Sequence, residues 1–177
     1  MRLPTRGLIA AALLFAADQL SKWVVLEPLG INQLGASQDI TSFFALRFVP
    51  NIGVSLGLLP ADSDAARWAL VAMTAAIAAA VAVWMTREKQ ATDQIALGLV
   101  LGGALGNILD RVRFGYVVDF ADLHVMTPWG YWRPFLVFNV ADAAITVGVL
   151  VLLVRAFLTR EPAKPPRGET SVENTHA

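Results

Sequence analysis

The chain has 177 residues, of which 56% are hydrophobic and only 16% charged, and its mean hydropathy is +0.57. Soluble domains carry a charge on about a quarter of their residues, so the composition excludes an ordinary soluble domain and indicates a membrane protein. The formal net charge is zero, and the chain has no cysteine. Disulfides, a thiol nucleophile and thiolate metal sites are therefore excluded.

Four apolar segments are each long enough, at about 20 residues, to cross a hydrocarbon core of about 30 Å. They lie at residues 7–26, 66–85, 94–112 and 134–158. We expect an all-α integral membrane protein with four transmembrane helices, in which residues 1–158 form one membrane-embedded domain. The first segment also has features of a cleavable signal peptide, but its apolar run continues past any small-residue cleavage site, which favours a helix that stays in the chain.

The basic residues predict the orientation. They precede the first segment, join the second to the third and follow the fourth: Arg2, Arg6, Arg87, Lys89, Arg155, Arg160, Lys164 and Arg167. By the positive-inside rule these parts are cytoplasmic, and residues 27–65 and 113–133 lie on the outer side. Residues 159–177 are polar and rich in proline, and we expect a disordered cytoplasmic tail.

The two outer connections differ in composition. The first contains many β-branched and aromatic residues, with Pro50, Asn51 and Gly53 as turn residues, which predicts a small β-hairpin or sheet between the first two helices. The second concentrates aromatic residues that suit a membrane interface: Tyr116, Trp129, Tyr131 and Trp132.

The third segment contains Gly98, Gly102 and Gly106 at intervals of four residues. This G-x-x-x-G pattern allows another helix backbone to approach closely, so we expect the third segment to be the central helix.

Polar residues gather in the part of each segment nearest the predicted outer side. They are Asp18 and Lys22 in the first segment, Asn107, Asp110 and Arg111 in the third, and Asn139 and Asp142 in the fourth. Their spacings of three or four residues put each set on one helix face. One buried carboxylate alone suggests a paired structural charge, whereas three sets at one depth predict a site open to the outer face.

Carboxylates are the best catalytic candidates. A metal site needs several histidines or carboxylates, but the only histidines are His124, which we expect at the surface, and His176 in the tail. A Ser/Lys dyad lacks a well-placed serine, because Ser21 points about 100° away from its neighbour Lys22 on a helix, which leaves Ser55 as the weaker alternative. Two close carboxylates share a proton and suit aspartic-protease chemistry, and the predicted partner of Asp142 is Asp119 in "GYVVDF".

Four blocks of the sequence resemble those of the lipoprotein signal peptidase (signal peptidase II) family, in the family's order. They are "ADQLSKW" (17–23), "PNIGVSLG" (50–57), "GGALGNILDRVRFGYVVDF" (102–120) and "FNVADAAI" (138–145). The resemblance implies that Asp119 and Asp142 are the catalytic aspartates. It also implies a set of substrate-binding or supporting residues: Asp18, Lys22, Asn51, Gly53, Asn107, Asp110, Arg111 and Asn139.

The resemblance further implies a multi-pass enzyme of the bacterial inner membrane with its active site near the periplasmic face. Such an enzyme cuts diacylglyceryl-modified prolipoproteins just before the lipidated cysteine, without a metal or cofactor. Its partners are these substrates and membrane lipids, and not nucleic acid. Asn107 and Asn139 are expected to hydrogen-bond the carboxylates or the scissile backbone, and Arg111 to pair with Asp110 or a lipid phosphate. Where the family commonly has Ala-Ala-Phe, this chain has Val54, Ser55 and Leu56, so the contact surface of that loop is expected to differ.

The two alternatives to a protease are a transporter and a non-catalytic assembly subunit. A small proton- or ion-coupled transporter also lines up carboxylates in its spans, but its polar residues should continue toward the cytoplasmic side. Here the inner halves "GLIAAALLF", "QIALGLVL" and "ITVGVLVLLV" contain no ionisable group. A non-catalytic assembly subunit would leave the polar residues at one depth without a purpose. The one-sided arrangement favours an enzyme.

Overall fold

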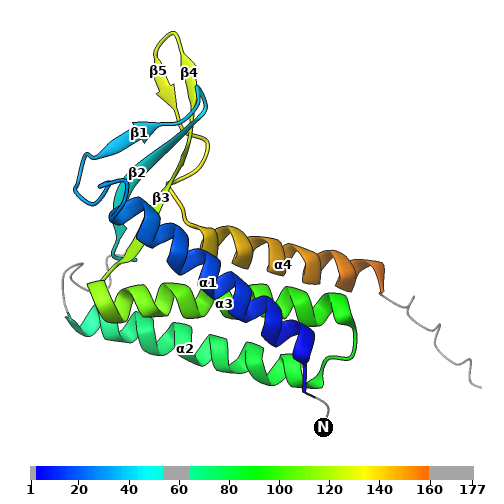
Figure 1. Cartoon of the computed structure of the whole chain (residues 1–177). Helices are drawn as coiled ribbons and strands as arrows, with labels where there is room; N and C mark the ends of the chain where they lie inside the picture. The colour runs from blue at the N-terminus through cyan, green and yellow to red at the C-terminus, as the bar shows by residue number, and fades with distance from the viewer. Residues whose placement is uncertain (1–2, 54–63, 160–177) are drawn as a thin grey trace, which may run out of the picture.

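The computed structural model describes residues 3–53 and 64–159, and this part of the chain contains four helices and five short strands. In chain order they are α1 (Thr5–Leu26), β1 (Ser37–Asp39), β2 (Phe44–Asn51), α2 (Asp64–Arg87), α3 (Ala91–Phe114), β3 (Val117–Leu123), β4 (Val125–Thr127), β5 (Gly130–Trp132) and α4 (Val140–Leu158). The helices lie side by side, and the strands gather at one end of the bundle (Figure 1). The tail from residue 160, Arg2 and the predicted departure at Val54, Ser55 and Leu56 lie outside the described residues.

The helices confirm the first three predicted segments, each of which lies inside one helix. All four helices are long and apolar enough to cross a membrane. The start of the fourth segment was predicted wrongly, because α4 begins at Val140 and not at residue 134. Phe138 instead pairs with Ala121 of β3 in an isolated antiparallel bridge. Its backbone groups are used in that pairing, so they cannot belong to a helix.

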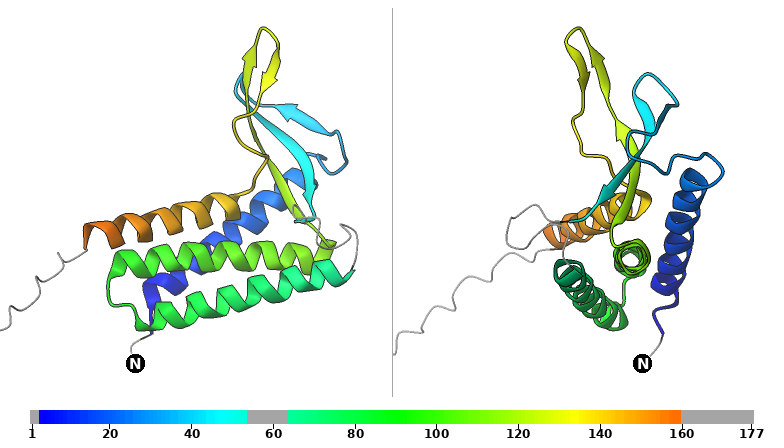
Figure 2. Two further views of the ribbon diagram at one scale, coloured as in Figure 1. Left: turned by 180° about the vertical axis from the view of Figure 1, so that it is seen from behind. Right: turned by 90° about the vertical axis from the view of Figure 1, so that its left-hand side faces the viewer.

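The third helix is central, as the glycine pattern predicts. In its most apolar stretch 61% of the residues are buried, against 11–22% in the other three helices. Figure 2 shows α3 between α1, α2 and α4. A Cβ on Gly102 would lie 2.5 Å from the carbonyl oxygen of Ala11, and one on Gly103 would lie 2.7 Å from that of Ala141. Small residues on α3 therefore allow the backbones of α1 and α4 to pack directly against it.

The antiparallel sheet has the order β1-β2-β3. The prediction of a sheet between the first two helices holds for β1 and β2 but is incomplete, because β3 comes from the connection after α3. Gly115 makes this possible: it ends α3 with φ +87°, a conformation that other residues rarely adopt, and turns the chain into β3. The sheet packs on the end of α1 through apolar residues that include Val25, Phe48 and Val118.

The β4–β5 hairpin projects away from the helices (Figure 1). Its tip exposes Trp129, which is 94% accessible, and Trp132 is more than half exposed. His124, just before this hairpin, was predicted at the surface but is buried, with only 4% of its area exposed. It lies at the end of β3, where its backbone N–H donates to the carbonyl oxygen of Phe43 at 3.0 Å, so the turn before β2 covers it.

Candidate active site

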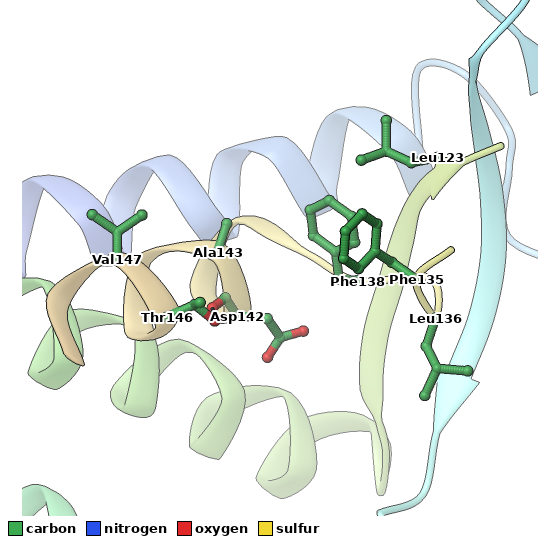
Figure 3. A pocket seen from close by; sticks show the side chains of 8 residues that line it. All are labelled: Leu123, Phe135, Leu136, Phe138, Asp142, Ala143, Thr146 and Val147. Atoms are coloured by element: carbon green, nitrogen blue, oxygen red, sulfur yellow. Dashed lines mark hydrogen bonds between the residues drawn. The ribbon is translucent and has the colours of Figure 1, made fainter. Parts of the chain in front are cut away.

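The two predicted catalytic carboxylates come from different elements that meet at the sheet end of the bundle. Asp119 is the third residue of β3, and only 2% of its area is exposed. Asp142 is the third residue of α4 and is partly buried. Figure 3 shows the Asp142 carboxylate turned from α4 toward β3.

Two asparagines connect the carboxylates. Asn139 donates from Nδ2 to Oδ1 of Asp119 at 2.7 Å, and Asn107 donates from Nδ2 to Oδ1 of Asp142 at 2.8 Å. The asparagines also contact each other, because Nδ2 of Asn139 lies 3.3 Å from Oδ1 of Asn107. Both are buried. The prediction that Asn107 and Asn139 hydrogen-bond the carboxylates is confirmed.

The start of α4 fixes Asp142 more closely. The side chain of Asn139 accepts from the backbone N–H of Asp142 at 2.9 Å, and Oδ2 of Asp142 accepts from the backbone N–H of Asn139 at 3.3 Å. This reciprocal pair is a capping box, which satisfies two N–H groups that a helix end leaves without partners. The same asparagine thus caps the helix and holds the carboxylate of β3.

Asn51 approaches Asp119 from the other side. It is the last residue of β2, and its Nδ2 donates to Oδ2 of Asp119 at 3.0 Å. Its own Oδ1 accepts from the backbone N–H of Gly53 at 2.9 Å. Gly53 has φ +74°, and a Cβ there would lie 3.2 Å from a terminal nitrogen of Arg111. The sequence pattern of Asn51 and Gly53 therefore serves one turn that places an amide on the carboxylate.

The surroundings of Asp119 raise its pKa to about 7. Burial is the largest cause, because it disfavours the charged form, and the nearby charge of Asp142 acts in the same direction. Hydrogen bonds from Asn51 and Asn139 oppose the rise without cancelling it. A carboxyl group with this pKa is partly protonated at neutral pH.

A buried ionic cluster lies behind the asparagines. Nζ of Lys22 lies 2.8 Å from Asp18 and 2.7 Å from Asp110, and it also donates to Oδ1 of Asn107 at 3.3 Å. That last contact occupies the amide oxygen of Asn107, so its NH₂ group points to Asp142. Of the two predicted partners of Arg111, Asp110 is instead paired with Lys22, from another helix, and no Asp110–Arg111 ion pair occurs among the described residues. The other predicted partner, a lipid phosphate, stays a prediction.

The same cluster joins the elements that carry the carboxylates. Asp18 accepts from the backbone N–H of Ala141 in α4 at 3.0 Å, and Asp110 accepts from that of Val118 in β3 at 3.1 Å. Gln19, which the sequence analysis missed, donates to both Asp18 and Asp110, at 3.1 and 3.0 Å. Gln19 lies within the "ADQLSKW" block, next to Asp18, but it is uncharged, so the search for charged residues on one helix face did not select it.

Arg111 of α3 lies near both carboxylates. It interacts electrostatically with Asp142 and Asp119, yet within residues 3–53 and 64–159 it makes no ion pair, and its Nε has no hydrogen-bond partner. Its backbone is held by Arg67 of α2, whose Nε donates to the Arg111 carbonyl oxygen at 2.7 Å. The backbone of Arg111 is therefore fixed near the carboxylates, while its Nε has no hydrogen-bond partner among the described residues.

An apolar groove of about 470 Å³ leads to Asp142 (Figure 3). Its walls come from α4, the end of β3 and the segment between β5 and α4: Leu123, Phe135, Leu136, Phe138, Ala143, Thr146 and Val147. Asp142 is the one charged residue among those that line it. The groove fits an apolar molecule that reaches a carboxylate at one point.

Comparison with known proteins agrees with this geometry. Residues 10–158 match the family model described as signal peptidase (SPase) II. Proteins named lipoprotein signal peptidase from Sphingopyxis alaskensis and Rhizorhabdus wittichii are each 54% identical to the chain, and each match covers 94% of both sequences. A solved structure titled as a bacterial membrane enzyme superposes with a TM-score of 0.71 at 28% identity, covering 88% of this chain and 94% of that one.

The match to the family model and the two relatives span the helices, the sheet and all the residues of the site described above. The chain belongs to the signal peptidase II family of membrane proteases.

Proposed function

We propose that Asp119 and Asp142 are the catalytic pair with which this chain cleaves diacylglyceryl-modified prolipoproteins just before the lipidated cysteine. The observation that carries this proposal is the shared network of Asn107 and Asn139, which holds two carboxylates of different elements in one site. The relatives' name, lipoprotein signal peptidase, supports the substrate class. Membership of a protease family also favours this function over the transporter and the assembly subunit.

The chemistry follows from a pair that holds one proton. Because burial raises the pKa of Asp119 to about 7, the shared proton resides mainly on Asp119. Asp142 then takes a proton from water as the water oxygen attacks the scissile carbonyl, and Asp119 donates its proton to the carbonyl oxygen. When the tetrahedral intermediate collapses, the C–N bond breaks, the amine nitrogen takes the proton that Asp142 received, and one hydroxyl of the intermediate returns a proton to Asp119, which leaves a carboxylic acid and the singly protonated pair. The pair works only when singly protonated, so the rate should follow a bell-shaped pH profile.

The groove suits a substrate that arrives through the lipid. It is apolar, it is bordered by exposed residues of α4 such as Val147, and it ends at Asp142. We place the sheet end of the bundle at the periplasmic face of the inner membrane and both termini in the cytoplasm. The basic residues Arg87, Lys89 and Arg155 lie at the opposite end of the bundle and support this orientation.

The test is a gel-shift assay of a lipidated prolipoprotein in liposomes. The intact protein should release the signal peptide, whereas Asp119→Asn and Asp142→Asn should lose at least about 1,000-fold in rate, because each removes a proton-transfer step. Asp39→Asn, an exposed carboxylate on β1, is the matched control and should cleave normally. If either active-site variant folds and cleaves at a rate like the intact protein, the assignment of the pair is wrong.

A further inference from the structure

A second buried carboxylate lies in β3, three residues after Asp119, and takes no part in the network described above. Asp122 has no exposed area and is bound by two arginines. Nε of Arg47 lies 2.9 Å from its Oδ2, and Nε of Arg133 lies 3.0 Å from its Oδ1. Burial alone would raise the pKa of Asp122, but the hydrogen bonds and charges of Arg133 and Arg47 outweigh it and lower the pKa, so the group is ionised at neutral pH.

Each arginine lies in a part of the chain that helps to position one of the two carboxylates. Arg47 is in β2, at the shift in register between Leu46 and Val49, and β2 ends at Asn51, which donates to Asp119. Arg133 follows β5 and opens the segment that leads to α4 and Asp142. Asp122 therefore joins β2, which places Asn51 on Asp119, to the segment that leads to Asp142.

The segment before α4, residues 133–138, is held to β3 at both ends. Arg133 forms its ion pair with Asp122, and Phe138 donates to the carbonyl oxygen of Ala121 and accepts from the N–H groups of Phe120 and Ala121. Between these points Phe135 is 61% exposed and Leu136 is 91% exposed, so they pack weakly. Figure 3 shows the side chains of Phe135 and Leu136 near β3. The ion pair fixes the Arg133 end of this segment to β3, and the backbone hydrogen bonds of Phe138 fix its other end.

We propose that Asp122, with Arg47 and Arg133, is a positioning centre that sets the separation of the catalytic pair Asp119 and Asp142. The proposal rests on the proposed function and extends it to residues that touch neither substrate nor reacting atoms. The physical reason is that a displacement of about 1 Å in a catalytic group costs about 100-fold in rate. A buried carboxylate with two arginine partners suits this task, because its charge is fully compensated only while both arginines are bound.

The first experiment measures kcat and KM of Arg133→Gln and Arg133→Lys for a lipidated prolipoprotein. Arg133→Gln should lower kcat about 10- to 100-fold while KM changes less than about threefold, because substrate binding is retained and the transition state is misaligned. Arg133→Lys keeps the charge and should recover most of kcat. The matched control is Arg113→Gln, whose guanidinium lies over the ring of Phe114 at 4.9 Å and does not reach Asp122; it should behave like the intact protein.

The second experiment separates positioning from a simple charge effect by the width of the bell-shaped pH profile of kcat. Asp122→Asn and Arg133→Gln change the local charge in opposite directions, so charge alone would move the profile in opposite directions. If the carboxylates move apart, their repulsion weakens, and the bell narrows in both variants. The other charged groups that act on the pair, Arg111 of α3 and Lys22 of α1, are present in both variants.

Misfolding is controlled by the double variant Asp122→Asn/Arg133→Gln, which replaces the ion pair of these two residues by two amides. Arg47 keeps its charge, but its side chain is 34% exposed, so that solvent compensates it. The double variant should fold, and its kcat should stay low. An unchanged bell width in both single variants, or a kcat loss that only follows the loss of folded protein, overturns the positioning role. In the same assay, cleavage by the intact protein and its loss in Asp142→Asn test the proposed function separately.

Discussion

The two carboxylates of the proposed catalytic pair are held in different ways. Asp119 is a strand residue whose two oxygens each accept from an amide side chain, Asn139 on one and Asn51 on the other. Asp142 is at the first turn of a helix, where its oxygens accept from Asn107 and from a backbone N–H. The two carboxylates therefore have different environments. In the proposed mechanism this difference keeps the shared proton mainly on Asp119.

The pKa of Asp119 predicts the alkaline side of the pH profile. Its raised value of about 7 means that Asp119 keeps its proton below neutral pH and loses it as the pH rises through 7. Because the mechanism requires that proton, kcat should fall above about pH 7 and also fall in acid, where both carboxylates are protonated. The measurement is kcat from about pH 4 to pH 9, with Asp39→Asn as a control that keeps the bell. A rate that stays constant across this range would contradict the shared proton.

Single residues were predictable where the signal was local. Asp18 and Lys22 are four residues apart on one helix, so their pairing follows from helix geometry. The partner of Asp110 was not predictable in this way, because it depends on how α1 and α3 are rotated against each other. His124 shows the same limit, since a turn remote in sequence covers it.

At the scale of elements, the start of α4 does two tasks with one residue. Asn139 caps the helix through its oxygen and binds Asp119 through its nitrogen. The helix therefore cannot begin one residue earlier or later without moving an active-site contact.

Asn139→Ser separates the two tasks. Serine is also a good N-cap, so the helix should keep most of its stability, but the amide that donates to Asp119 is lost. We expect activity to fall about 100-fold, the effect of losing a fixed contact to a catalytic group, while the melting temperature in detergent changes little. Asn139→Ala, which also removes the cap, should cost about 1 kcal/mol more in stability. Full activity of the serine variant would show that the amide is not needed.

The elements themselves were predictable to different degrees. Apolar runs define helices well, because a span needs a fixed number of residues, and three of the four helices agree with the prediction. The start of α4 was missed because Phe138 pairs with β3, and this pairing leaves no periodic pattern in residues 134–139. The third strand was missed because β3 pairs with β2, whose residues are 66 to 79 positions away in the sequence, from Asn51↔Val117 to Phe44↔Leu123.

At the scale of the whole molecule, the bundle is arranged around one buried helix. Strand β3 and helix α4, which carry the two carboxylates, both attach to the end of α3 nearest the sheet. The buried ionic cluster joins α1 to them. The site therefore lies at one end of the bundle, which agrees with an enzyme that works at one face of a membrane.

The orientation can be tested with alkaline phosphatase, which needs disulfides and folds only outside the cytoplasm. Fused after Thr159, the reporter should be inactive, because the C-terminus is placed in the cytoplasm. Inserted in the β4–β5 turn after Thr127, it should be active. An insertion after Lys89, in the connection between α2 and α3, is the cytoplasmic control. Activity at Thr159 together with inactivity at Thr127 would reverse the proposed orientation.

The hydrogen bond from Ala141 to Asp18 joins residues 123 positions apart, near the two ends of the described chain. A ribosome makes Asp18 early and Ala141 late. The Asp18 carboxylate is therefore without the Ala141 N–H donor during most of synthesis. A chain that stops before residue 140 still has three spans and one of the two carboxylates. Such a chain lacks Asp142, and Asp18 lacks the backbone N–H of Ala141. If Asp119 and Asp142 act as the proposed pair, the active site is complete only after the last helix has been made, and a partly made chain should be inactive.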